Sequence, residues 1–100
     1  VVFRPCVFTP VAGKFAGEAC RGLQVHVTGP RLVNGFEVGI HLLDVIRETT
    51  PELTFNAHFD RLFGDDVLRL GKESPAAVMA RGRAESAAFL RETGPFRLYR

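Results

Sequence analysis

Strict alternation of apolar and polar residues marks one strand in this sequence. Over residues 23–28 every second side chain is apolar, which is the period of a strand that turns one face to a core. The two faces differ in chemistry, with Leu23, Val25 and Val27 on the apolar side and Gln24, His26 and Thr28 on the polar side. The pair Gly29-Pro30 ends this strand by turn chemistry.

A second strand is expected earlier in the chain. The segment Val2–Phe8 is rich in residues that favour strands. Because Pro5 has no amide hydrogen to donate, this strand is predicted to lie at an edge or a bulge. Residues 9–17 contain Pro10, Gly13 and Gly17, too many breakers for regular structure, so a loop is predicted there.

Residues 36–49 change to helical spacing. At 100° per residue one side of this helix gathers apolar residues, namely Val38, Gly39, Leu42, Leu43, Val45 and Ile46. The other side gathers polar residues, namely Glu37, His41, Asp44, Arg47 and Glu48. The pattern predicts an amphipathic helix that lies on a sheet.

Two further helices are predicted from capping signals. Residues 56–63 form a short helix ending at Gly64, after which Asp65 caps one or two turns. The pair Ser74-Pro75 opens the last helix, which runs to residue 93 and stops at Gly94-Pro95. Its predicted buried stripe comprises Val78, Met79, Gly82, Ser86, Phe89 and Leu90.

Short strands are predicted at residues 53–55 and at the end of the chain, residues 96–100. The order of elements indicates a two-layer α+β domain, in which a small, mainly antiparallel sheet has helices packed on one face.

Composition narrows the class of protein. A chain of 100 residues, 46% of them hydrophobic, is typical of a single soluble globular domain spanning residues 1–100. No apolar run approaches the roughly 20 residues that span a bilayer, so no membrane partner is expected. The 13 basic and 11 acidic residues are scattered, which argues against a nucleic-acid partner. The first residue is Val1 rather than Met, so we expect a piece cut from a longer chain.

Candidate catalytic and metal sites are weak. The cluster of Glu37, His41, Asp44 and Glu48 has the residue types of a metal site, but the absence of a second His or a Cys favours a solvated charged face. We therefore expect no metal, no cofactor and no catalytic residue in this chain.

The chain has two cysteines, Cys6 and Cys20. A disulfide between them would contribute about 3 kcal/mol. We expect two free thiols instead, because a core this apolar does not need a covalent link.

Seven short matches, in order along the chain, resemble one known family. They are Phe8-Thr9-Pro10, the run from Lys14 to Glu18, Cys20 with Gly22, the run from Leu23 to Thr28, the run from Gly39 to Leu43, the run from Phe59 to Leu62 with Gly64 and Asp66, and the run from Phe96 to Tyr99. Together they are similar to the C-terminal domain of bacterial exo-β-N-acetylmuramidases, long known only as a domain of unknown function.

The resemblance implies part of a glycoside hydrolase of peptidoglycan recycling that removes N-acetylmuramic acid from the non-reducing end of cell-wall fragments. In that family a larger, Rossmann-like N-terminal domain holds the catalytic carboxylate, and the C-terminal domain packs over the cleft. The resemblance also implies a periplasmic or secreted location. Three positions depart from the family pattern: Gly29 replaces an acid, Val33-Asn34-Gly35 replaces an aromatic-proline segment, and Gly82 lies where a large aromatic is usual.

The residues matched to the family motif include Lys14, Cys20, Gly22 and His26. We expect Lys14, Gln24 and His26 to bind substrate, because their side chains can donate hydrogen bonds to sugar hydroxyls, to the lactyl carboxylate or to the stem peptide. The face with Gln24 and His26 either lines a cleft or is an ordinary solvated face. Three functions stay open: an accessory domain of the muramidase, a glycan-binding module and a purely structural docking domain.

Overall fold

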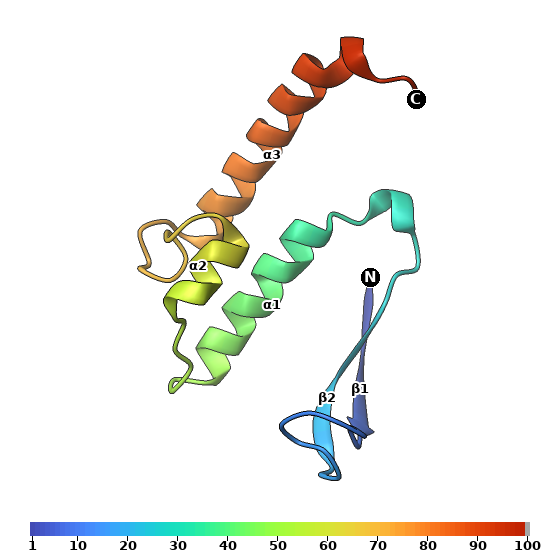
Figure 1. The fold of residues 1–100 in the computed structure, drawn as a ribbon, viewed down its shortest axis with the longest axis vertical. Coiled ribbons are helices and arrows are strands. Elements are labelled where there is room, and N and C mark those ends of the chain that lie inside the picture. Colours follow the sequence, from blue (N-terminus) through green and yellow to red (C-terminus); the bar gives the residue numbers. More distant parts are fainter. Residues whose placement is uncertain (100) are drawn as a thin grey trace. The chain divides into compact units, whose positions relative to one another are not determined.

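The computed structural model describes residues 1–99 (Figure 1). Its contacts divide the chain into two compact units, Val1–Asn34 and Gly35–Arg100. The first unit holds two strands and the second holds three helices. The α+β class predicted from the sequence is confirmed.

The first unit is an antiparallel hairpin of β1 (Val2–Phe8) and β2 (Cys20–His26). Its register pairs Val2 with His26 at the open end and Phe8 with Cys20 beside the loop. The second strand therefore begins three residues before the predicted start at residue 23 and ends two residues before residue 28. Residues 20–22 belong to the strand because their backbone pairs with β1. Their side chains do not alternate between apolar and polar, so the sequence pattern did not include them.

The loop that joins the two strands has a defined path, although it contains no helix or strand, as predicted. The amide of Gly17 donates to the carbonyl of Pro10 at 2.9 Å and closes the loop. Gly13 and Gly17 have φ angles of 93° and 80°, a region that favours glycine.

The second unit contains α1 (Gly35–Thr49), α2 (Ala57–Phe63) and α3 (Pro75–Thr93). Two short 3-10 helices, Pro30–Leu32 and Gly94–Phe96, lie outside them along the chain. The predicted caps at Gly64 and Ser74 are confirmed, whereas Asn56, predicted as the first residue of a helix, is the N-cap of α2. The Asn56 side chain accepts from the amides of His58 and Phe59, Gly64 ends α2 at a φ of 90°, and the Ser74 side chain accepts from the amide of Ala77.

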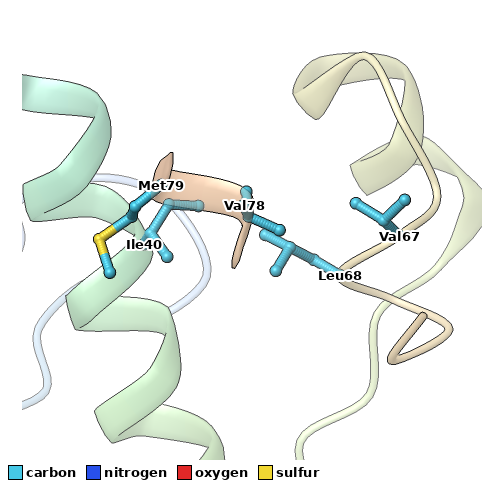
Figure 2. Close-up of a cluster of buried hydrophobic side chains, with 5 residues drawn as sticks. All are labelled: Ile40, Val67, Leu68, Val78 and Met79. Atoms are coloured by element: carbon cyan, nitrogen blue, oxygen red, sulfur yellow. The ribbon is translucent and has the colours of Figure 1, made fainter. Parts of the chain in front are cut away.

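A small core holds the helical unit together (Figure 2). It contains five buried side chains, which are Ile40 from α1, Val67 and Leu68 from the turn after α2, and Val78 and Met79 from α3. Leu43, Phe59 and Phe63 pack against it. The core also involves a polar residue at its edge, because Arg47 donates a 2.8 Å hydrogen bond to the carbonyl of Leu68.

The buried face of α1 differs from the predicted one. Ile40 is 3% exposed, whereas Val45 and Ile46 are 54% and 42% exposed. The turn that carries Leu68 and the first half of α3 select the side of α1 that contains Ile40, and the predicted side is left partly open.

Only the first half of the predicted stripe on α3 is buried. Val78 and Met79 are in the core, but Phe89 and Leu90 are 61% and 51% exposed. The helices α1 and α3 run in opposite directions (Figure 1). The first turn of α1 contacts the middle of α3, where Glu37 binds Arg83. The second half of α3 extends past the start of α1.

Two predicted strands are wrong. Residues 53–55 are irregular, and Leu53 donates to Thr50 in a turn instead. Phe96 closes a 3-10 helix and Arg97, Leu98 and Tyr99 are irregular, while Arg100 lies outside the described residues. A strand needs a partner, and among residues 1–99 neither segment has one.

Candidate functional site

One face of the hairpin carries most of the side chains singled out as candidates. The register pairs Arg4 with Gln24 and Val2 with His26, so these four side chains share a face, since alternate residues of a strand point the same way. Gln24 and His26 therefore lie together, as the sequence pattern indicated. The same face continues toward the loop through Cys6, Gly22, Phe8 and Cys20.

His26 has an unsatisfied polar atom. Its ring is half-buried, and Nε2 is shielded from solvent without a hydrogen-bond partner in the described part of the chain. A buried polar atom without a partner costs free energy of the order of 1–3 kcal/mol. A ligand group or another protein surface would recover this cost only if the groups that shield Nε2 move to let it form the missing hydrogen bond.

Arg4 is a candidate that the sequence pattern missed. It is exposed and lies directly across from Gln24. Within residues 1–99 it forms no ion pair. A guanidinium beside an amide and an imidazole is suited to a carboxylate, which Arg binds through two parallel hydrogen bonds. Once the pairing of β1 with β2 is known, the alternation of side chains along β1 places Arg4 on this face.

Lys14 lies at the other end of the hairpin. It is in the loop that follows Phe8, and its Nζ is 5.3 Å from the centre of the Phe15 ring. His26 pairs with Val2, the first residue of β1. It lies six residues along β2 from Cys20, which is beside the loop, and at about 3.3 Å for each residue this distance is roughly 20 Å. The structure brings Gln24 and His26 together but does not bring Lys14 to them. Only a ligand longer than one sugar could reach all three.

The two thiols are free, as predicted. Both are half-buried, and Cys20 Sγ donates to the carbonyl of Glu18 at 3.7 Å. Cys6 and Cys20 are diagonal neighbours on one face, because the direct partner of Cys6 is Gly22. The ring of Phe8 leans over Gly22 and would be 3.0 Å from a Cβ there. The ring therefore crosses the diagonal that joins the two thiols.

A pocket of about 170 Å³ lies in the helical unit. Its lining comprises Phe36, Phe63, Gly64, Asp65, Val78, Arg81 and Glu85. This volume is below the 300 to 1,000 Å³ of ordinary ligand sites.

The one cation in the pocket lining is held by carboxylates. Arg81 contacts Asp65, Glu73 and Glu85 at 3.3 Å each. The hydrogen bond to Glu73 is the main reason that the pKa of Arg81 is raised. The cation is thus held inside the unit rather than offered to a ligand.

On the charged side of α1, Glu37 contacts α3, whereas His41 and Glu48 are exposed. Arg83 donates two hydrogen bonds to the Glu37 carboxylate, at 2.5 and 2.8 Å, and these raise the pKa of Arg83. Within residues 1–99 no group of three or more His, Cys, Asp or Glu side chains could hold a metal ion. Over the same residues, no helix is both long and apolar enough to cross a membrane.

The residues of the Phe59 to Asp66 motif have structural roles. Asp60 binds Arg69 at 2.7 Å, and Asp66 binds Lys72 at 2.8 Å. The hydrogen bond from Lys72 is the main cause of the lowered pKa of Asp66. The motif therefore shapes the turn that carries the core residues after α2.

Comparison with known proteins places the whole described chain in one family. The family model described as exo-beta-N-acetylmuramidase NamZ, C-terminal, matches residues 1–99. The chain belongs to the NamZ C-terminal family. A relative from Bacillus subtilis (strain 168), the peptidoglycan beta-N-acetylmuramidase NamZ, is 30% identical over 81 residues. The alignment covers 78% of this chain and 20% of the relative, so the chain spans about a fifth of that protein. No solved structure matches.

Proposed function

We propose that this chain is the accessory C-terminal domain of an exo-β-N-acetylmuramidase that acts on peptidoglycan, and that it packs over the substrate cleft of a larger catalytic domain in the same polypeptide. The family match over residues 1–99 is the observation that carries the proposal. The Bacillus relative is about five times as long as its aligned segment, which leaves room for a separate domain with the catalytic groups.

The acids of this chain are poorly suited to hydrolysis. Glycoside hydrolysis uses two carboxyl groups on either side of the scissile bond, about 5 to 9.5 Å apart. Glu18 is the one acidic residue in the sequence of the hairpin unit. In the helical unit Asp60, Asp65 and Asp66 are each bound by a cation. Catalysis is therefore assigned to the upstream domain.

The polar face of the hairpin is the proposed substrate contact. N-acetylmuramic acid carries hydroxyls, an acetamido group and a lactyl carboxylate, which is often extended by a peptide. Gln24 and His26 can donate to the sugar or to the amide, and Arg4 can bind the carboxylate. Lys14, about a strand length away, is placed to meet a distant part of a longer fragment, such as the far end of the stem peptide.

His26→Ala in the intact enzyme tests this assignment. We expect kcat/KM on a muropeptide to fall about tenfold, since one hydrogen bond to a bound sugar contributes roughly 1 to 1.5 kcal/mol. His58→Ala is the matched control, because His58 is exposed on α2 in the other unit. The control should leave kcat/KM unchanged, and both variants should keep their thermal unfolding midpoint.

Two results would contradict the proposal. If His26→Ala unfolds the protein while activity per folded molecule is unchanged, His26 is a structural histidine. If the intact enzyme has no muramidase activity, but a glycan shifts the NMR signals of Lys14 and His26, the chain is a binding module instead.

A further inference from the structure

An apolar stripe follows α3 from one end to the other. Val78, Gly82, Ser86 and Phe89 recur at spacings of three and four residues, which places them on one side of the helix. The stripe is buried at its start, where Val78 is 1% exposed, and exposed to solvent at its end, where Phe89 is 61% exposed. Leu90 lies beside Phe89 and is 51% exposed.

The length of α1 explains where the stripe becomes exposed. An added Cβ at Gly82 would be 2.8 Å from the ring of Phe36, and Arg83 binds Glu37. Both partners lie in the first turn of α1, which begins at Gly35. About ten residues of α3, or roughly 15 Å, continue beyond this point without α1 beside them (Figure 1).

The segment after α3 adds to the exposed apolar surface. Phe96, Leu98 and Tyr99 are 84%, 91% and 89% exposed. Arg97 holds this segment to the helix end, because its amide donates to Gly94 and its guanidinium donates to the Thr93 hydroxyl at 3.2 Å. Soluble proteins rarely expose large apolar patches of this kind unless the patch binds a partner.

We propose that the exposed end of α3 and the tail after it, which comprise Phe89, Leu90, Phe96, Leu98 and Tyr99, form the surface on which the upstream domain of the intact enzyme docks. The inference rests on the proposed function, since it assigns a surface to that domain. The family region is C-terminal and about four fifths of the relative lies outside the alignment, so a large upstream partner in the same polypeptide is the occupant to which we commit.

The chemistry of the surface fits a protein partner. Aromatic side chains are enriched at the centres of protein interfaces, and charges of both signs are common at their rims. Here three aromatic rings lie among Arg91, Glu92 and Arg97. The mixed signs of these charges do not favour a polyanion.

A pair of cysteine variants in the intact enzyme tests the surface without relying on catalysis. Phe89→Cys places a thiol in the proposed interface, and Ala84→Cys places one at an exposed site on the other side of the same helix. Alkylation by a small maleimide, followed peptide by peptide by mass spectrometry, gives a rate for each position. We expect the thiol at position 89 to react at least tenfold more slowly than the thiol at position 84. The two rates should be equal in denaturant.

Three results would overturn the inference. Equal rates in the native enzyme would mean that nothing covers the surface. Protection that disappears on dilution, together with a fall in molecular mass, would assign the surface to a second copy. In a further variant, a protease site inserted before Val1 allows the upstream part to be cleaved off and removed. If the thiol at position 89 is still protected afterwards, the upstream part does not cover this surface. Because none of these readouts needs turnover, an inactive enzyme would refute the proposed function and leave the docking result to be judged on its own.

Discussion

Replacing either of two isoleucines on α1 by alanine should have unequal effects on stability. Ile40 is 3% exposed in the core, and Ile46 is 42% exposed two turns later. Both substitutions remove the same atoms from the same helix, so the change in intrinsic helix propensity cancels when the two variants are compared. The difference that remains reports burial and packing.

The expected magnitudes follow from these exposures. Ile→Ala removes three carbons, and at about 0.8 kcal/mol for each buried carbon the transfer loss at Ile40 is about 2.4 kcal/mol. The unfilled space adds to this loss, which brings Ile40→Ala to about 3 kcal/mol. At Ile46, which is 42% exposed, a little over half of the transfer loss applies, about 1.4 kcal/mol, and no closed cavity forms.

Thermal unfolding of the purified chain, followed by circular dichroism, measures the difference. A gap of about 1.6 kcal/mol corresponds to a difference of roughly 10 °C in Tm for a domain of this size. Urea unfolding gives the same comparison as free energies and shows through the m value whether the unfolded states match. If Ile46→Ala lowers Tm as much as Ile40→Ala, the described orientation of α1 is wrong.

Two smaller predictions concern a helix end and an ion pair. Gly64→Ala should cost about 1 kcal/mol because Gly64 has a φ of 90°, whereas Gly39→Ala, where an added Cβ meets nothing within 4 Å, should raise the free energy of unfolding by up to about 1 kcal/mol; urea titration of both variants checks the opposite signs. Lys72 lowers the pKa of Asp66 below its ordinary 3.8, so the stability advantage of the parent over Asp66→Asn should be complete above that value and should vanish as the pH falls through the lowered pKa; acid titrations of both proteins test this, and an advantage that persists at the lowest pH would contradict it.

Local signals in the sequence predicted most of the element boundaries. Ser74-Pro75, Asn56 and Gly64 are side-chain and backbone caps that act within one turn, so they can be recognised without tertiary information. The alternation around Gln24 and His26 was equally local. These features therefore appear in the structure where the pattern placed them.

The orientation of α1 could not be predicted in the same way. Apolar residues cover a little over half of the circumference of this helix, which is wider than one packing face, and they include Phe36, Val38, Ile40, Leu43 and Ile46. Several orientations therefore bury similar amounts of apolar surface, and the neighbouring helix and turn decide among them. The absent strand at Phe96 has a related cause, because strand propensity depends on a pairing partner that a local pattern does not contain.

The candidate site shows the same limit. Gln24 and His26 were found on one face from a single strand, but Arg4 belongs to another strand and needed the register of the pair. Lys14 was grouped with them by the resemblance and by the hydrogen bonds that its side chain can donate, and neither the motif nor the side-chain chemistry contains the distance along the hairpin.

The register of the hairpin has a consequence for its oxidation chemistry. Cys6 and Cys20 are diagonal neighbours, and the Cα atoms of such a pair are about 7–8 Å apart, which is too far for a disulfide unless the backbone moves. A cross-link between the two strands would need a shift of the pairing by two residues, which would place the two cysteines directly opposite each other. Resistance to oxidation in this hairpin therefore depends on the pairing of its backbone and not on the chemistry of its thiols.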